Sequence, residues 1–341
     1  MQLAEFALGQ SPYPWQHQRW QSLFEAVSAQ KLPHALLFAG VPGVGKTHLA
    51  MLLAQRLLCL TAAAELACGK CKACQLLAVG THPDLLLLEP EAVGKAIKID
   101  AIRHANDFLS KTAQQGGRKV VVIAPAEAMT TGAANALLKS LEEPAGSAHI
   151  MLVSHQTSAV LSTIRSRCRL LAFGLPDMDA VVPWLTPIAG NRIAPEQLLS
   201  LAGGAPLAAR GLLDGDSLEQ HQQLVQNLRD LAQGQKGPLA LASEWLAQDH
   251  QQVLCWFQLW LSQLLKNLQW QQPSPDNVEA FDWAVSLMGE AGAPVLHRLY
   301  EKVGRARQAL AGPSNPNTQL LLEEIALDWQ ALCRAFARRS R

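Results

Sequence analysis

Residues 40–47 constrain the fold of this chain more than any other stretch of the sequence. They read Gly-Val-Pro-Gly-Val-Gly-Lys-Thr, the G-x-x-x-x-G-K-[ST] pattern of a phosphate-binding loop (P-loop). An apolar run, 34–39, precedes the loop, and a helix-forming run, 48–58, follows it. Strand, glycine-rich turn and helix in this order predict a nucleoside triphosphate site. The alternative is an ordinary glycine-rich turn between a strand and a helix.

Each residue type in this loop has a physical role. The glycines let the backbone turn tightly and point its N–H groups inward. Lys46 would reach the β- and γ-phosphates, Thr47 would hold Mg²⁺, and the helix N-terminus would add positive potential. The sequence therefore predicts a site for ATP or ADP with Mg²⁺, and hydrolysis is a separate question. The predicted nucleotide-binding residues are Gly40, Gly43, Val44, Gly45, Lys46, Thr47 and His48.

Length, charge and composition narrow the class of protein. A chain of 341 residues exceeds one typical hydrophobic core, so two or three domains are expected. A net charge of +1 gives no strong field toward nucleic acid or membrane. Residues 1–6 lack the features of a signal peptide, and no uncharged apolar run reaches membrane-spanning length. We expect a cytoplasmic protein without membrane contacts.

Four of the seven cysteines form a cluster after the P-loop helix. Cys59, Cys68, Cys71 and Cys74 follow the spacing C-x8-C-x2-C-x2-C, which brings four thiolates onto one small loop. Four sulfur ligands leave no open position, so this pattern predicts a structural Zn²⁺ site rather than a catalytic one. Unrelated buried or redox-active cysteines are the alternative.

Through residue 175, stretches with a helical pattern alternate with stretches that have a strand pattern. Before the P-loop, Tyr13-Pro14-Trp15 and the helical stretch after it suit either contact with a nucleotide base or plain domain core. Buried strands alternating with helices predict a doubly wound α/β domain with the P-loop at its carboxyl edge. The expected strands are 83–89, 119–125, 149–154 and 169–173, and the expected helices are 101–111 and 132–143.

Beyond residue 176 no strand pattern recurs. Residues 177–215 predict three short helices, broken at Pro183, Pro187, Pro195 and the Gly-Gly-Ala-Pro of 203–206. From 216 onward longer amphipathic helices follow, the first apolar face running from Trp245 to Trp270. The C-terminal part is therefore expected to be all-helical.

Four motifs follow one another along the chain in an order that is typical of a known protein family. They are the P-loop, the cysteine insertion, Ala-Asn-Ala-Leu-Leu-Lys-Ser-Leu-Glu-Glu-Pro at 134–144, and Ser-Arg-Cys at 166–168. Together they resemble the AAA+ clamp-loader subunits of bacterial DNA polymerase III, strongly over 13–175 and more loosely beyond. The resemblance implies a parallel P-loop sheet with a zinc knuckle, a small helical lid and a helical collar. The implied domains are 1–175 with the insertion 59–74, a lid over 176–215, and a collar for oligomerisation over 216–341.

The chain departs from the family's ATPases at the end of a strand. Those subunits carry an Asp for Mg²⁺ and a Glu that activates water where this chain has Ala124 and Pro125. Glu127 is the nearest carboxylate, but it falls three residues late and beyond the expected strand end. The family's γ-phosphate-sensing arginine aligns with Leu207, and Arg210 lies one helical turn further on. These losses remove several kcal/mol of transition-state stabilisation, so nucleotide binding is expected to survive and turnover is not.

Within the family, the chain resembles the delta-prime branch rather than gamma/tau, because the chain is short and its ATPase residues are incomplete. The resemblance implies that Arg167 of Ser-Arg-Cys acts as an arginine finger in a neighbouring subunit's nucleotide site. The alternative is a surface salt bridge made by Arg165, Arg167 or Arg169.

The implied function is that of a stator-like subunit of a hetero-oligomeric clamp loader, a component of a DNA polymerase holoenzyme. Its implied partners are the gamma/tau and delta subunits, the sliding clamp and primed DNA. One rival is a gamma-like motor that hydrolyses ATP itself, which the intact P-loop favours. Another is a DNA-binding zinc module. The near-neutral charge argues against it, as does the small number of knuckle lysines, which are only Lys70 and Lys72.

Overall fold

A computed structural model describes residues 10–61, 65–92, 94–270, 278–311 and 316–339 of the chain. The chain folds into two compact units, Met1–Val181 and Val182–Arg341. Residues 1–6, on which the signal-peptide argument depends, lie outside the described residues. None of the helices in the described ranges is long and apolar enough to cross a membrane. The three-domain division at 175/176 and 215/216 stays a prediction.

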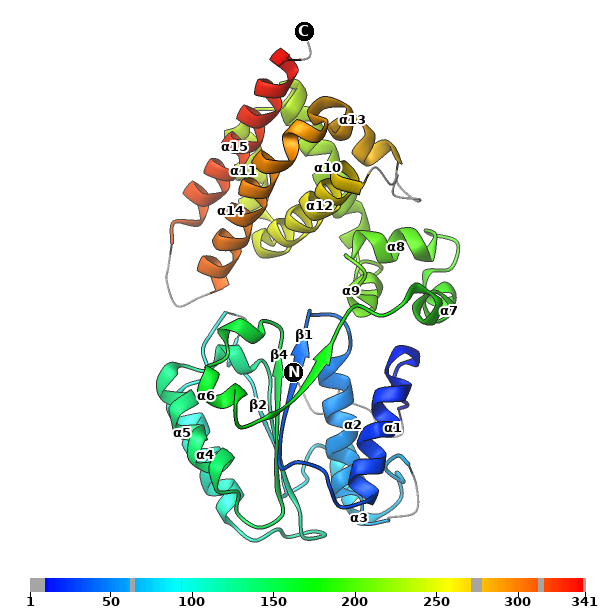
Figure 1. The fold of residues 1–341 in the computed structure, drawn as a ribbon, viewed down its shortest axis with the longest axis vertical. Coiled ribbons are helices and arrows are strands. Elements are labelled where there is room, and N and C mark those ends of the chain that lie inside the picture. The colour runs from blue at the N-terminus through cyan, green and yellow to red at the C-terminus, as the bar shows by residue number, and fades with distance from the viewer. Residues whose placement is uncertain (1–9, 62–64, 93, 271–277, 312–315, 340–341) are drawn as a thin grey trace. The chain divides into compact units, whose positions relative to one another are not determined.

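The N-terminal unit is built on a five-stranded parallel sheet in the order β2-β3-β4-β1-β5, which confirms the predicted α/β class (Figure 1). Its strands are β1 (Ala35–Gly40), β2 (Leu85–Leu88), β3 (Lys119–Ile123), β4 (Ala148–Ser154) and β5 (Arg169–Phe173). Its helices are α1 (His17–Ser28), α2 (Lys46–Leu58), α3 (Lys72–Ala78), α4 (Ile99–Ser110), α5 (Thr131–Glu142) and α6 (Ser162–Arg165).

Two apolar clusters bury the two faces of the sheet. One contains side chains of α1 and α2, and the other contains side chains of α4 and α5, which lie on the opposite side of the sheet in Figure 1. All four residues of β3 from Val120 to Ile123 are 0% exposed, because strands of a parallel sheet covered on both faces bury successive side chains on both sides. The continuous apolar runs of the sequence are thereby explained.

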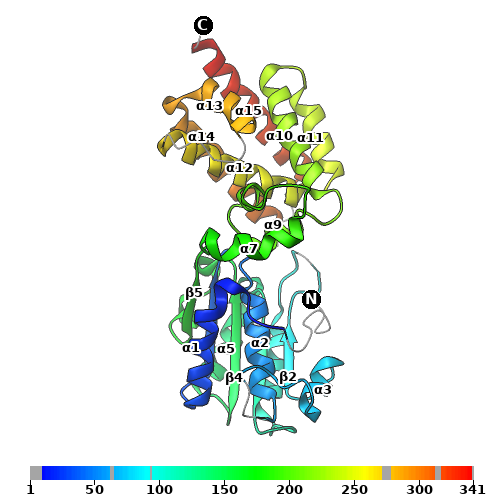
Figure 2. The ribbon, with the colours of Figure 1, turned by 90° about the vertical axis from the view of Figure 1, so that its right-hand side faces the viewer.

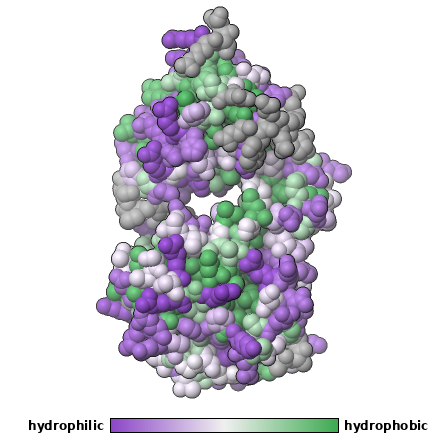
Figure 3. Space-filling model, viewed as in Figure 1, coloured by the Kyte–Doolittle hydropathy of each residue, from purple (hydrophilic) through white to green (hydrophobic). Residues whose placement is uncertain are grey.

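Strand β5 is different because it lies at the edge of the sheet and pairs only with β1. Its Leu170 is 49% exposed, and Leu175 just beyond it is 50% exposed. Figure 3 shows apolar residues gathered on the face of the N-terminal unit that carries β5, bordered by polar side chains. An exposed apolar strand edge of this kind favours contact with another chain.

The register of β5 on β1 fixes which loops share an edge of the sheet. Arg169 pairs with Leu36, and Phe173 pairs with Gly40. The P-loop, which follows Gly40, therefore lies at the carboxyl edge. Residues that directly precede Arg169 lie at the amino edge.

The C-terminal unit is all-helical, as expected. After α7 (Met178–Ala189), it comprises α8 (Pro195–Leu201), α9 (Pro206–Gly211), α10 (Ser217–Gln233), α11 (Pro238–Ala247), α12 (His250–Trp270), α13 (Val278–Met288), α14 (Ala293–Ala311) and α15 (Thr318–Arg339) (Figure 2). An aromatic cluster forms part of its core, where the Trp329 ring meets those of Phe257 and Trp260 edge-on with centroids 5.9 and 5.5 Å away. Such edge-to-face contacts are favourable in buried cores.

Two details of the helical prediction are wrong. Helix α7 continues through Pro183 and Pro187 instead of breaking there. Val181, Leu185 and Ala189, one turn apart, are at most 1% exposed, and burying this stripe holds the helix together across the missing N–H groups.

The apolar face expected to run from Trp245 to Trp270 belongs to two helices. Trp245 lies on α11, and α12 starts at His250. The Asp249 carboxylate accepts hydrogen bonds from the N–H groups of Gln251 and Gln252, which caps the new helix and explains the break.

Candidate functional site

The P-loop has the geometry that its sequence predicts. Strand β1 ends at Gly40, and α2 begins at Lys46 directly after Gly45, whose φ of +86° is left-handed. A Cβ at Gly45 would lie 2.6 Å from Gln16 Nε2 and 2.9 Å from the Tyr13 ring. Glycine is therefore needed at position 45 both for the turn and for the close packing of the N-terminal segment.

Lys46 is directed into its own loop. Its Nζ donates hydrogen bonds to the carbonyl oxygens of Gly40 and Val41, at 2.8 and 2.6 Å, and the residue is 2% exposed. Burial lowers the pKa of Lys46 to about 8, partly offset by the negative charge of Glu127. A phosphate that binds Lys46 Nζ has to compete with these two carbonyl oxygens for its hydrogen bonds.

The N-terminal segment packs over the loop. Trp15 Nε1 and Gln16 Nε2 both donate to the Val44 carbonyl, at 3.1 and 2.9 Å. The Tyr13 ring stacks on Trp15 at 4.9 Å and lies 4.4 Å from the His48 ring. Burial lowers the pKa of His48 to about 4, so its imidazole is neutral at physiological pH.

A cavity of about 160 Å³ opens beside this segment. The Arg19 guanidinium lies over the Phe173 ring at 4.4 Å, forming a flat wall of the cavity. Its lining is Trp15, Gln16, Arg19, Val44, Phe173, Gly174, Leu175 and Pro176. Flat aromatic and guanidinium surfaces next to a P-loop suit a nucleobase, and that assignment of Trp15 stays a prediction.

The residues after β3 argue against hydrolysis of ATP by this chain. β3 ends at Ile123, Ala124 is 7% exposed, and Pro125 leads into a 3-10 turn over Ala126–Ala128. Neither of the first two residues after this strand has a carboxylate to hold Mg²⁺ or to activate water.

Glu127 lies closer to the P-loop site than its position in the sequence indicates. The turn after β3 returns it to the carboxyl edge, where its Oε1 accepts from the N–H groups of His155 and Gln156 at 2.8 and 3.2 Å, just past β4. Its buried Oε2 has no hydrogen-bond partner among the residues that the structure describes, and its charge raises the pKa values of Lys46 and His155 against the effect of burial. Because one oxygen is held by the loop after β4, Glu127 orders that loop and balances Lys46 but does not replace both missing carboxylates.

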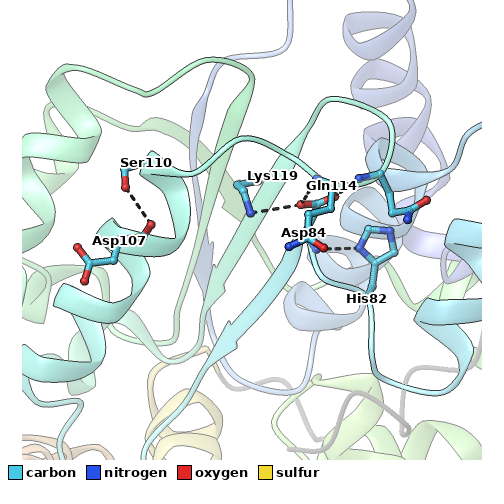
Figure 4. A network of polar contacts seen from close by, with 7 residues as sticks. His82, Asp84, Asp107, Ser110, Gln114 and Lys119 are labelled. Atoms are coloured by element: carbon cyan, nitrogen blue, oxygen red, sulfur yellow. Dashed lines mark hydrogen bonds and ion pairs between the residues drawn. The ribbon is translucent and has the colours of Figure 1, made fainter.

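A second buried carboxylate, Asp84, lies at the wrong edge for nucleotide chemistry. Asp84 precedes β2, is 0% exposed, and accepts from the Gln114 and Gln115 N–H groups and, at 3.2 Å, from Lys119 Nζ (Figure 4). Burial alone would raise the pKa of Asp84, but these backbone donors and Lys119 together lower it. Since β2 and β3 both begin here, this network holds the amino edge of the sheet together.

The four predicted metal ligands are brought together. The Sγ atoms of Cys59, Cys68, Cys71 and Cys74 all lie within 4.8 Å of one another, with Cys59–Cys71 at 4.0 Å and Cys68–Cys74 at 3.9 Å. Four sulfurs around one Zn²⁺ at about 2.3 Å would be roughly 3.8 Å apart, so the donor set fits a tetrahedral ion. This group of four cysteines can hold a metal.

Backbone donors prepare this cluster for ligation. N–H groups of Lys70 and Cys71 lower the pKa of Cys68 to about 5, and a metal ligand has to be a thiolate. Burial raises the pKa of Cys74, so the ion itself would have to favour its deprotonation. Cys59 is the C-cap of α2, so the cluster lies at one end of the helix whose other end carries Lys46.

Arg167 lies in the turn between α6 and β5, at the amino edge of the sheet. Its Nε and NH2 groups donate to Glu142 Oε1 at 2.7 and 2.5 Å, and its NH1 donates to the Thr163 carbonyl at 2.9 Å. Its side chain is still 35% exposed. A surface salt bridge thus exists at Arg167, and the role of this arginine in a neighbouring site stays a prediction. Arg210, which follows Leu207 by one helical turn, is an exposed residue of α9 in the C-terminal unit.

Known proteins resemble this chain along nearly its whole length. A family model described as DNA polymerase III, delta subunit, matches residues 15–176, and one for the C terminal part of that subunit matches residues 215–331. The DNA polymerase III subunit delta' of Pseudomonas aeruginosa is 40% identical over 94% of this chain and 98% of its own length. That of Yersinia pestis is 34% identical over 93% of this chain and 95% of its own.

A solved structure also aligns with the chain. A DNA polymerase III gamma subunit-related protein from Thermotoga maritima aligns over 92% of this chain and 100% of its own with a TM-score of 0.43 and 19% identity. A likeness at this level adds nothing about function.

Proposed function

Since the chain belongs to the DNA polymerase III delta-prime subunit family, we propose that it completes a neighbouring subunit's ATP site in a clamp loader without turning over ATP itself. In this role the chain is a stator. Its own P-loop holds nucleotide weakly or as structure, and its Arg167 serves the neighbour's hydrolysis.

The observation that carries this proposal is the position of Arg167 relative to the chain's own P-loop. Arg167 precedes β5 at the amino edge, whereas Lys46 follows β1 at the carboxyl edge. The five-residue strand β5 covers roughly 13 Å between these edges at about 3.3 Å per residue. An arginine side chain does not cover that distance within one chain, so Arg167 cannot reach a phosphate in this chain's own P-loop. This supports a role for Arg167 in the site of another subunit.

Charge at the two sites supports different roles for Arg167 and Lys46. A guanidinium at a neighbour's site stabilises charge that develops on the transferred phosphoryl group. The chain's own site has Lys46 but lacks carboxylates at Ala124 and Pro125, so a bound nucleotide would find phosphate contacts without the second metal-holding group or the base that activates water.

The remaining assignments follow from the family and the donor sets. The cysteine cluster holds a structural Zn²⁺, and the P-loop accepts ATP or ADP with Mg²⁺ through residues 40–48. The helical unit after residue 216 joins the gamma/tau and delta subunits, and the assembly places the sliding clamp on primed DNA in the cytoplasm. In these assignments the chain functions within a hetero-oligomer and not as an isolated subunit.

Steady-state ATP hydrolysis by the purified chain, beside its Lys46→Ala variant, tests the proposal. We expect the two to hydrolyse ATP at the same background rate, because catalysis needs the missing carboxylates. A clear rate that the Lys46→Ala change abolishes would mean that Glu127 or another group supplies the chemistry. The chain would then be a gamma-like motor, the function that the intact P-loop favours.

A further inference from the structure

The contacts of Arg167 within the free chain point to a second residue that acts through it. All three guanidinium nitrogens of Arg167 are engaged: Nε and NH2 with Glu142 Oε1, and NH1 with the Thr163 carbonyl. A longer contact of 3.4 Å joins NH1 to Ser166 Oγ. These contacts favour one orientation of a side chain that would otherwise sample many rotamers.

The other two arginines of this turn are not held in the same way. Arg165 makes one contact of 3.4 Å with the Thr157 carbonyl. Arg169 begins β5 and is exposed, and across the described ranges no ion pair is recorded for either residue. Of the three, Arg167 is the one that a carboxylate orients.

The place of Glu142 on its helix is also informative. Glu142 is the last residue of α5, and a carboxylate at a helix C-terminus is repelled by the negative end of the helix dipole. The guanidinium of Arg167 compensates for this repulsion. The same guanidinium lies just past the C-terminal end of α6, where its NH1 group donates a hydrogen bond to the Thr163 carbonyl.

We propose that Glu142 is a positioning residue that orients the Arg167 guanidinium toward the anion of a neighbouring subunit; this inference rests on the proposed function. A guanidinium has five N–H donors. The short contacts use three of them, and the second NH1 donor makes the longer contact with Ser166 Oγ. The remaining NH2 donor and the weakly held NH1 donor are left for phosphate oxygens, on a side chain that is 35% exposed. The pair thus fixes the direction of the group before the neighbour arrives, which reduces the entropy that the assembled site has to lose.

The effect of Glu142 is expected to be modest, since both partners are partly exposed and such pairs are weak in water. Loss of orientation should lower the turnover number at the neighbour's site by about three- to tenfold and leave its KM for ATP unchanged, because Arg167 acts mainly in the transition state. Glu143, the next residue, provides a matched control: it is exposed and has the same charge, and no ion pair is recorded for it in the part of the chain that the structure describes.

A double-mutant cycle in the reconstituted clamp loader tests the inference. The complex is assembled with wild-type chain or with Glu142→Ala, Glu142→Gln, Glu143→Ala, Arg167→Ala, or Glu142→Ala combined with Arg167→Ala. DNA-stimulated ATP hydrolysis gives kcat and KM for each complex. Thermal unfolding of each free chain controls for folding.

We expect Glu142→Ala to lower kcat, Glu142→Gln to recover part of it through its amide oxygen, and Glu143→Ala to match wild type. Adding Glu142→Ala to Arg167→Ala should have no further effect, since Glu142 acts through Arg167. The inference is overturned if Glu142→Ala lowers kcat equally with Arg167 absent, leaves it unchanged, or raises it, the last meaning that the pair restrains the arginine. An unchanged rate with Arg167→Ala alone would instead contradict the proposed function, together with this inference.

Discussion

The P-loop and the Arg167 turn of the N-terminal unit both carry a cation that suits a nucleotide phosphate, but they use it differently. Lys46 is 2% exposed and bonded to carbonyls of its own loop, while the Arg167 side chain is 35% exposed and held at its base by Glu142. Both cations are bonded within the chain, but Lys46 is buried while Arg167 stays partly exposed and keeps one donor without a contact among the described residues. The two cations therefore differ in how accessible they are to a group from outside the chain.

The difference comes from the surroundings of each cation. The P-loop is covered by residues 13–16 and opens onto a strand end without carboxylates, whereas the Arg167 turn precedes an edge strand that presents apolar side chains to solvent. Removal of the metal, a change of pH and substitution of Trp15 should each affect nucleotide binding at the P-loop and leave the action of Arg167 unchanged.

Loss of the metal should have the largest effect. Cys71→Ser should reduce bound zinc from one per chain to none and lower the free energy of unfolding of the N-terminal unit by roughly 3–5 kcal/mol, a part of the binding energy of structural zinc. Because Cys59 caps α2, nucleotide affinity at the other end of that helix should also fall. Metal analysis and thermal unfolding would measure both effects.

Cys255→Ser is the matched control, since Cys255 belongs to α12 of the C-terminal unit and is not one of the four clustered cysteines. A wild-type chain that contains no zinc, or a Cys71→Ser chain as stable as wild type, would contradict the metal assignment.

Nucleotide affinity should depend on pH through Lys46. Its pKa in the nucleotide-free chain is lowered to about 8 by burial, and bound phosphates favour the charged lysine. Below pH 8 the proton is already present and affinity should be flat. Above pH 8 binding has to take up a proton, so affinity should fall by up to about tenfold per pH unit.

Titration of the chain with a fluorescent ATP analogue from pH 7 to pH 9 measures this slope, and the Lys46→Ala variant should lack it. Activity that depends on Arg167 should not share the slope, because arginine side chains keep their charge in this range. An affinity that rises with pH would show that Lys46 does not contact the nucleotide.

The smallest effect is expected at Trp15. Its indole lines the cavity beside the P-loop, and its Nε1 donates to the Val44 carbonyl. Trp15→Ala should weaken nucleotide binding by about fivefold, or about 1 kcal/mol, through loss of an aromatic contact. Trp15→Phe, which keeps a ring but not the donor, should retain most of the affinity, and equal losses in both variants would assign the effect to the hydrogen bond instead.

Much of the fold was predictable because its signals are local. Buried parallel strands read as continuous apolar runs, so 119–125 and 149–154 predict β3 and β4 with an error of at most two residues at either end. The P-loop and the cysteine spacing are likewise local patterns, and the structure brings each group together.

The rest depends on tertiary contacts. Glu127 reaches the site because the turn after β3 meets the loop after β4, 28 residues further along the chain. Helix α7 passes two prolines because its buried stripe holds it. The contact between Glu142 and Arg167 joins the end of α5 to the turn after α6, 25 residues further along the chain, and no periodicity in the sequence indicates it.

The most direct test of the account compares the two cations in one assembly. Clamp loaders reconstituted with Lys46→Ala or Arg167→Ala chain would be assayed for ATP hydrolysis during clamp loading. We predict that complexes with Lys46→Ala keep the wild-type rate. Arg167→Ala should reduce hydrolysis at the adjacent site on the order of 10³-fold, the loss typical of an arginine finger. A complex that depends on Lys46 and tolerates the loss of Arg167 would contradict it.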